Sequence, residues 1–444
     1  MTKYKYFMSF FFVIVIIIGW YLVSYTFNAE YNWWSSQKEY IKTEFEKENS
    51  KAKILFILND MSATGAPMMA LRLSKVLREN GYAVGAMYGS SDDIRPNFES
   101  LGIPVINAYV EEKNEKYFQD FAKEFDLVIV NSGYFYLAYQ KSSEVRPTIW
   151  WIHDLLTWVK PYIKEKYLSG GKISEKSLSA LGPSEQFFRD LEDIEFIELF
   201  SNADIVTVSE YSKMFLHQSV KKGVEVINNG VDDAEIEDSL KEGSSDLYHS
   251  LLKDKNENNK IVFLQVGMVI SRKAVHLTLE AIKRMPKEYQ DKIVLYIIGN
   301  LEDDYASSLM KKYANFDNIK WVGQVSRDVL NDYYRVADVL TVPSSADPSP
   351  CVITEAAMYG VPAIISNKVG STYIIKDNDS GYVFEYPDVI TLKERMMYCI
   401  DNPDSCKKMG EKAKQYFYET STKDMFAKKW LEKIENKLKE KGLK

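Results

Sequence analysis

A chain of 444 residues is too long for one ordinary hydrophobic core and suits two domains of roughly 150–200 residues each. Its composition, 46% hydrophobic and 27% charged, is that of a globular protein, and a net charge of -7 with no strongly basic block argues against nucleic acid as a partner. The three cysteines and four histidines lie at no ligand spacing, which argues against a zinc site and against a disulfide framework.

The N-terminus begins with a long apolar segment. No charged residue lies between Tyr6 and Phe27, and about 20 apolar residues suffice for a helix to cross a bilayer. The alternative is a cleaved signal peptide, which has a shorter apolar core and a small-residue cleavage site that the residues after Tyr25 do not offer. We therefore predict a single-pass transmembrane anchor over residues 1–29.

Residues 30–50 differ in composition from the segments on both sides. They are polar, with Trp33, Trp34, Tyr40 and Phe45 interspersed. Aromatic residues on a polar helix favour an interfacial position. We therefore predict a juxtamembrane helix that lies on the bilayer surface.

From residue 51 onward, short continuous apolar runs alternate with stretches of helical periodicity. Continuous apolarity is typical of parallel strands that are covered on both faces, and alternation with helices predicts doubly wound sheets. The first series of runs comprises Ile54–Leu58, Ala83–Met87, Leu127–Val130, Thr148–Ile152 and Ile205–Val208. The second series comprises Ile261–Val266, Ile293–Ile298, Ile319–Val322, Val339–Val342 and Pro362–Ile365.

A polar, charged stretch between Asp232 and Lys260 separates the two series. It predicts an N-terminal Rossmann-like domain over residues 51–235 and a C-terminal Rossmann-like domain over residues 236–415. Residues 416–444 carry an apolar stripe, which predicts a C-terminal helix that packs back on the N-terminal domain. The expected fold class is α/β, with two Rossmann-like domains facing a central cleft, and ligands are expected at the strand ends that line this cleft.

Two candidate residues follow strands of the N-terminal domain. Gly65 lies in the loop after the first strand, just before a helix, where free amides can hold an anion; a plain tight turn is the alternative. His153 follows the strand Thr148–Ile152, so its imidazole is expected in the cleft, where it could hydrogen-bond a sugar hydroxyl. A histidine that only satisfies backbone groups is the competing interpretation.

The C-terminal domain offers two cations after its first strand. Gly267 directly follows that strand, and Arg272 and Lys273 come just before the next helix. Adjacent cations near a helix start suit a diphosphate, because the helix dipole and the side chains act together. A solvated basic pair at a helix end is the alternative.

Two carboxylates follow the strand Val339–Val342. Asp347 lies in the loop, and Glu355, eight residues on, lies in the next helix. The loop acid suits a sugar ring, and the helix acid suits the two hydroxyls of a ribose, since a carboxylate accepts paired donors. After the next strand, Gly370 and Ser371 form a small-residue loop whose amides suit phosphate.

Taken together, these positions resemble the group 1 glycosyltransferases, family 4 of the GT-B superfamily. The resemblance runs from about Lys53 to the C-terminus. Asp347 and Glu355 are similar to the acid-x7-Glu signature of that family. The other matching positions are the basic pair Arg272-Lys273, the glycine Gly65, the pair His153-Asp154, the turn Asn229-Gly230-Val231-Asp232 and the segment Gly360-Val361-Pro362.

The resemblance implies transfer of a sugar from a UDP- or GDP-sugar to a glycan or lipid-linked acceptor, with retention at the anomeric carbon and with no metal or other cofactor. The N-terminal domain would take the acceptor and the C-terminal domain the donor. Lys273 would bind the diphosphate, Glu355 the ribose and Asp347 the donor sugar, while His153 would lie near the transferred sugar. The donor-binding set would be completed by Gly65, Gly267, Arg272, Gly370 and Ser371.

A membrane tether suits a lipid-linked acceptor, as used in surface polysaccharide or glycolipid synthesis. The segment Trp158–Phe200 is the expected acceptor side. Lys3 and Lys5 precede the apolar span and Glu30 follows it, so the positive-inside rule sends the body of the protein out of the cytosol. A nucleotide-sugar enzyme favours the cytosolic face instead, and the orientation stays open.

The chain also departs from the family pattern. Met268 stands where the family carries Arg or Ser, and Tyr373 stands about where an acid follows. Two other interpretations remain, a non-catalytic membrane-bound partner of a transferase and a GT-B nucleotide-sugar epimerase. The retained cation and acids argue against the first, and the anchor argues against the second.

Overall fold

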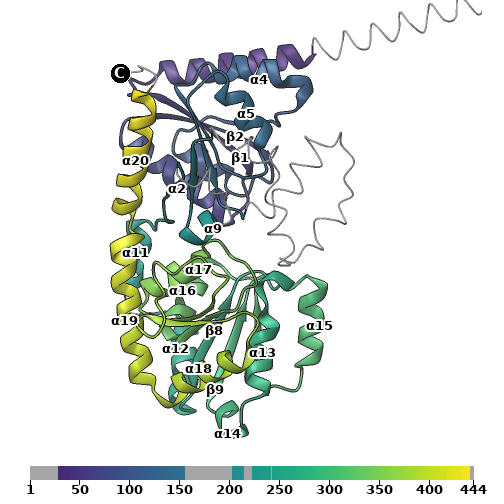
Figure 1. Ribbon diagram of the computed structural model, residues 1–444, viewed down its shortest axis with the longest axis vertical. Coiled ribbons are helices and arrows are strands. Elements are labelled where there is room, and N and C mark those ends of the chain that lie inside the picture. Colours follow the sequence, from purple (N-terminus) through teal and green to yellow (C-terminus); the bar gives the residue numbers. More distant parts are fainter. Residues whose placement is uncertain (1–28, 156–202, 215–222, 242, 441–444) are drawn as a thin grey trace, which may run out of the picture.

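The computed structural model describes residues 29–155, 203–214, 223–241 and 243–440. Figure 1 shows two α/β lobes, the N-terminal lobe above and the C-terminal lobe below. The predicted anchor over residues 1–29 lies outside this part of the chain except for its last residue. Within the described ranges, no helix is both long and apolar enough to span a bilayer, so the anchor stays a prediction.

The N-terminal lobe is built on a seven-stranded sheet of parallel strands in the order β3-β2-β1-β4-β5-β6-β7. Its strands are β1 (Lys53–Asp60), β2 (Ala83–Ser90), β3 (Val105–Asn107), β4 (Leu127–Val130), β5 (Thr148–Ile152), β6 (Ile205–Thr207) and β7 (Glu225–Val226). Its helices include α2 (Gly65–Glu79), α3 (Arg95–Ser100), α4 (Glu115–Ala122), α5 (Tyr136–Ser143) and α9 (Glu210–Met214).

The C-terminal lobe is built on a six-stranded sheet of parallel strands in the order β10-β9-β8-β11-β12-β13. Its strands are β8 (Ile261–Val266), β9 (Ile293–Ile298), β10 (Ile319–Gly323), β11 (Val339–Val342), β12 (Ala363–Ser366) and β13 (Gly381–Phe384). Its helices are α12 (Asp246–Glu257), α13 (Val275–Lys283), α14 (Lys287–Gln290), α15 (Asp304–Lys312), α16 (Arg327–Val336), α17 (Cys351–Met358), α18 (Val389–Asp401) and α19 (Pro403–Thr420), with α11 (Asp233–Leu240) leading into it. The two parallel sheets confirm the predicted fold class of two α/β domains.

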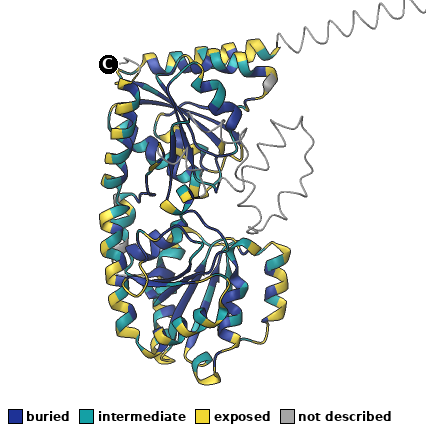
Figure 2. Ribbon diagram, viewed as in Figure 1, coloured by how far each residue is buried: buried dark blue, intermediate teal, exposed yellow. Residues whose placement is uncertain are grey.

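Each sheet is covered on both faces, which is why its strands are continuously apolar. Neighbouring residues of β5 show this directly, since Trp150 and Trp151 are both fully buried but belong to the cores on opposite faces of the sheet. Successive side chains of a strand point to opposite faces. In Figure 2 the sheets are accordingly buried, while the outer helix faces are exposed.

The last helix, α20 (Lys423–Lys439), returns to the N-terminal lobe (Figure 1). Its buried residues Phe426, Trp430 and Ile434 recur at helical spacing and join the core beneath β1 and β5. The preceding helix α19 extends to Thr420 within the C-terminal lobe, so the predicted boundary between residues 415 and 416 falls inside a helix. The chain changes lobes after α19, where the amide of Val231 donates to the carbonyl of Ser421 at 2.9 Å.

The predicted juxtamembrane segment forms a helix over residues 29–46 that packs on the N-terminal lobe. Trp34, Ile41 and Phe45 are buried in the same core as residues of α4. Trp33 on the neighbouring face remains 38% exposed. The apolar side of this helix is therefore used inside the protein, and a domain boundary at residue 51 would leave part of the lobe's core outside it.

Candidate active site at the lobe interface

The sequence-predicted residues lie at the carboxyl ends of the strands, where the two lobes meet. In a parallel sheet all strand carboxyl ends share one edge, so loops far apart in sequence are brought together there. Gly65 begins α2 after β1, and His153 follows β5; on the other lobe Asp347 follows β11 and Gly370 follows β12. The loops after β11 and β12 pair through a bridge between Asp347 and Val369.

The predicted diphosphate and sugar residues form one cluster on the C-terminal lobe. Lys273 Nζ lies 2.5 Å from Oδ2 of Asp347, and Nη1 of Arg272 lies 3.5 Å from the same oxygen. Arg272 also donates to the carbonyl of Ala346 at 2.9 Å. Only 5% of Asp347 is exposed, and the two cations compensate its buried carboxylate.

Glycines allow the backbone to approach closely next to this cluster. Gly267 and Gly299 end neighbouring strands β8 and β9 with φ of 129° and 148°, values that L side chains rarely adopt. A Cβ on Gly299 would lie 2.0 Å from the carbonyl oxygen of Gly267. The sequence pointed to Gly267 but not to Gly299, whose role depends on the neighbouring strand. Met268, beside them, is 49% exposed.

Glu355 is held by two partners that sequence reasoning missed. Nη1 of Arg327, the first residue of α16, donates to Oε1 of Glu355 at 2.7 Å, and the hydroxyl of Tyr334 donates to Oε2 at 2.9 Å. Only 8% of Glu355 is exposed. Both partners lie on a helix that carries no motif, and no local pattern marks them.

The loop around Gly370 joins the lobes. The Ser209 hydroxyl, at the start of α9 in the N-terminal lobe, donates to the carbonyl of Pro348 at 2.5 Å. A Cβ on Gly370 would lie 1.8 Å from that carbonyl oxygen and 2.5 Å from Ser209 Oγ, so only glycine fits. The amide of Gly370 donates to the carbonyl of Asp347 at 2.8 Å. This amide therefore holds the Asp347 loop in place. The predicted contacts of Gly370 and Ser371 with donor phosphate stay predictions.

Burial favours the neutral forms of the two ionisable residues after β5. It lowers the pKa of His153 to about 3, and among the described residues Nε2 of that imidazole has no hydrogen-bond partner. Burial also raises the pKa of Asp154 to about 6, with a smaller opposing effect from Arg272 across the interface. At neutral pH His153 is therefore uncharged and can donate or accept one hydrogen bond at each nitrogen. The expected acceptor segment over residues 158–200 lies outside the described ranges.

Gly65 faces the other lobe. As the first residue of α2 it exposes helix amides, and a Cβ placed on it would lie 3.9 Å from Sγ of Cys351, the first residue of α17. The starts of two helices from different lobes therefore converge, and their dipoles together favour an anion between them.

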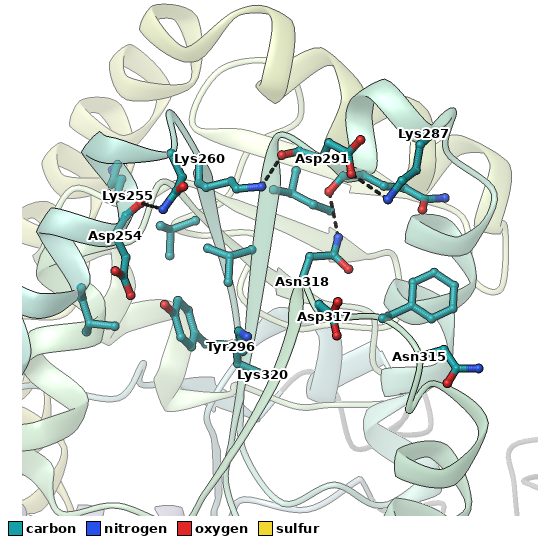
Figure 3. Close-up of a pocket in the computed structure, with 17 residues that line it drawn as sticks. Asp254, Lys255, Lys260, Lys287, Asp291, Tyr296, Asn315, Asp317, Asn318 and Lys320 are labelled. Carbon is teal, nitrogen blue, oxygen red and sulfur yellow. Dashed lines mark hydrogen bonds and ion pairs between the residues drawn. The ribbon is translucent and has the colours of Figure 1, made fainter.

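A cavity of about 710 Å³ lies elsewhere, at the amino ends of β8, β9 and β10 (Figure 3). Three of the four lysines that line it are already engaged: Lys255 lies 2.7 Å from Asp338, Lys287 lies 2.7 Å from Asp291, and Lys260 donates to the carbonyl of Asp291. Ligands of such sheets bind at the opposite edge. We therefore assign the functional site to the lobe interface.

Two family models match the chain, one in each lobe. "Glycosyl transferases group 1" matches residues 250–416, and "Glycosyl-transferase family 4" matches residues 50–215. Together the two matches span most of the chain and both halves of the site.

The individual relatives named here share about a quarter of their aligned residues with this chain. The capsular polysaccharide biosynthesis glycosyltransferase CapH of Staphylococcus aureus is 24% identical over 327 residues, covering 71% of this chain and 81% of CapH. A glycosyltransferase of Methanocaldococcus jannaschii is 24% identical over 197 residues, covering 44% of this chain and 50% of its own length. A second one from that organism is covered over 55% of its length, so the chain spans about half of these two relatives.

Solved structures share the fold. HepE of Anabaena, crystallised in complex with UDP-glucose, superposes with a TM-score of 0.68 at 17% sequence identity, covering 87% of this chain and 100% of HepE. The lipopolysaccharide biosynthesis glycosyltransferase WaaG superposes with a TM-score of 0.61 at 16% identity, covering 84% of this chain and 98% of WaaG. At this level of sequence identity, the similarity shows that the two-lobed fold is shared.

Proposed function

This chain belongs to the group 1 glycosyltransferases of the GT-B fold, and we propose that it transfers a sugar from a nucleotide-sugar donor to a glycan or lipid-linked acceptor, with retention and without a metal. One observation carries the proposal. Lys273, Asp347 and Glu355 all lie at the edge of the C-terminal lobe that meets the other lobe and are held by ion pairs, and both carboxylates are buried. This edge is where ligands bind in doubly wound sheets.

In the proposed complex, Lys273 binds the diphosphate and stabilises the charge that develops as the nucleotide leaves. Asp347 hydrogen-bonds the donor sugar, and Glu355 hydrogen-bonds the ribose. The 2.5 Å contact between Lys273 and Asp347 supports a common subsite for phosphate and sugar. The complex of HepE with UDP-glucose supports a uridine donor, with a GDP-sugar as the other candidate.

The proposed reaction needs no protein nucleophile. The acceptor hydroxyl attacks the anomeric carbon on the face from which the diphosphate departs, so the new C–O bond replaces the bond to phosphate without inversion. The departing phosphate oxygen accepts the hydroxyl proton. Neutral His153 hydrogen-bonds a sugar hydroxyl beside the reacting carbon, a role that its lowered pKa supports. No other cofactor is required, and within the described ranges no cluster of potential metal ligands is found.

The acceptor proposal combines the sequence with the named relatives. CapH acts in capsular polysaccharide biosynthesis, and the apolar N-terminal segment favours an acceptor at a membrane. We propose surface polysaccharide or glycolipid synthesis, with the active site on the side that holds nucleotide sugars.

The test is a panel of UDP- and GDP-sugars incubated with purified full-length protein, with and without membrane lipid extract as acceptor source. We expect one donor to release nucleotide, faster with acceptor, and the anomeric proton coupling of the product to show retention. A donor that is isomerised without nucleotide release would identify an epimerase. Absence of both binding and turnover across the panel would overturn the proposal.

A further inference from the structure

Helix α11 lies at the level where the two lobes meet (Figure 1), and its acidic residues contact both lobes. Asp232, just before the helix, lies 3.8 Å from Lys75 of α2 in the N-terminal lobe. Asp238 lies 2.8 Å from Arg335 of α16 in the C-terminal lobe. Between them, Glu235 contacts both lobes at once. The helix thus connects α2 to α16 through charged pairs.

Glu235 divides its two carboxylate oxygens between the lobes. Oε1 accepts from Arg72 of α2, and Oε2 accepts from Arg327 of α16. Arg72 is fixed from a second side, because its Nη1 donates to the carbonyl of Gly230 at 2.7 Å. The position of the Arg327 guanidinium is therefore tied to the N-terminal lobe.

The other terminal nitrogen of Arg327 reaches Glu355. A carboxylate offers about four acceptor positions, two on each oxygen. Arg327 takes one on Oε1 and Tyr334 takes one on Oε2. One position on each oxygen remains, which is the number that two neighbouring ribose hydroxyls need. The guanidinium also places a positive charge 2.7 Å from this buried carboxylate.

We propose that Arg327 is a positioning residue that holds the Glu355 carboxylate oriented for the donor ribose, and that Glu235 and Arg72 link this position to the contact between the lobes. The inference rests on the proposed function, because it requires Glu355 to bind ribose. It adds three residues outside the acid-x7-Glu segment to the donor site. It also means that loosening the lobe contact at α11 weakens nucleotide binding, because Arg72 and Glu235 act on Glu355 through Arg327.

The test compares binding of UDP and 2′-deoxy-UDP to the purified full-length protein by calorimetry. We expect wild type to bind UDP about 10- to 100-fold more tightly than 2′-deoxy-UDP, the range for a hydrogen bond to a charged group. Arg327→Gln should bring this ratio below about 3-fold, because the amide can neither balance the charge of Glu355 nor bridge to Glu235. Arg327→Lys should restore the ratio in part.

Arg335→Gln is the matched control. Arg335 lies on the same helix and pairs with Asp238 of α11 at 2.8 Å, and Glu355 is bonded by Arg327 and Tyr334 instead. A purely structural effect of weakening the α11–α16 contact would change both variants alike. We expect Arg335→Gln to keep the wild-type ratio, and thermal melts of both variants establish that they are folded.

The outcomes separate the inference from the proposed function. If Glu355→Gln loses the ratio while Arg327→Gln and Arg327→Lys keep it, the positioning role is overturned and the proposed function stands. If folded Glu355→Gln keeps the ratio, the ribose assignment itself fails. GDP and 2′-deoxy-GDP serve as the probe pair if UDP does not bind. If wild type binds neither UDP nor GDP, the proposed donor class is wrong, and the inference is overturned with it.

The link to the N-terminal lobe has its own test in a double-mutant cycle on UDP affinity. Glu235→Gln and Arg72→Gln should each weaken UDP binding several-fold. The double variant should lose no more affinity than the single variant with the larger loss, because both substitutions break the same connection. Additive effects would show that the two residues act separately and would overturn the link.

Discussion

At the proposed site, Lys273, Asp347 and Glu355 of the C-terminal lobe are held in ion pairs, whereas the residues after β5 in the N-terminal lobe are affected mainly by burial, which lowers the pKa of His153 to about 3 and raises that of Asp154 to about 6. Fixed, paired charges suit a nucleotide diphosphate, which is a polyanion with defined geometry. Neutral hydrogen-bonding groups suit sugar hydroxyls, which carry no charge. Two lobes of one architecture therefore differ in their buried ionisable groups: the C-terminal lobe pairs its charges, and the N-terminal lobe keeps His153 uncharged at neutral pH.

The lobes also differ in how they complete their cores. The N-terminal lobe uses the helix 29–46 and α20, from opposite ends of the chain, to cover its sheet. The core clusters of the C-terminal lobe, in contrast, draw on residues from Val231 to Phe417 alone. The N-terminal lobe therefore depends on both termini for its stability.

The largest effect is expected from shortening the chain. Deleting residues 1–50 removes buried Trp34, Ile41 and Phe45, and truncating just one buried side chain of this size to alanine costs about 2–5 kcal/mol. We expect loss of cooperative thermal unfolding of the N-terminal lobe. Deleting residues 1–28 alone should keep the melting temperature and release the protein from membrane fractions. If the shorter deletion stays membrane-bound and works equally well on native membranes, the tether prediction is wrong.

Glu355→Ala should reduce transfer by at least ~100-fold, because a lost hydrogen bond to a buried charge costs about 2–5 kcal/mol. It also leaves Arg327 and Tyr334 without their shared acceptor. Initial rates of nucleotide release with acceptor provide the measurement. Glu411→Ala on the exposed side of α19 is the control. Near-normal turnover of the Glu355 variant would refute its role at the donor.

Lys273→Gln should lower kcat/KM for the donor by roughly 100-fold, the lower end of the range for removing one preorganised electrostatic contact. Part of this loss should appear in kcat, because charge on the diphosphate grows as the sugar leaves. Lys408→Gln, on the exposed face of α19, supplies a charge-matched comparison. An unchanged kcat/KM in the Lys273 variant would move the phosphate site elsewhere.

The smallest effect concerns Asp154, whose pKa is raised from 3.8 to about 6 by burial. A raised carboxyl pKa means that the folded state binds a proton more tightly, so this group destabilises the fold as pH rises through that window. Asp154→Asn should therefore stabilise the protein by about 1–3 kcal/mol at pH 8 and by little near pH 4. Urea unfolding at the two pH values measures this. A stability gain of equal size at both would contradict the assignment.

Much of the fold followed from local pattern. Every continuous apolar run that we identified became a strand, because a parallel strand covered on both faces must be apolar at each position. Three strands were not predicted. The strands β3 and β7 have only three and two residues, which leave no pattern to detect, and β13 (Gly381–Phe384) begins with a glycine and has only four residues. The site's acids and its lysine were found because the residues that follow parallel strands meet at one edge.

The layered α/β architecture and the set of residues that face the lobe interface thus followed from local sequence pattern. Which of these residues pair depends on the packing of distant segments. Arg327 and Glu355, or Arg72 and Glu235, form ion pairs across 28 and 163 positions of the chain. In the sequence, a charged residue on a solvated helix cannot be distinguished from one in a buried ion pair. The partner that makes the difference comes from a distant segment, and the two meet only in the folded protein.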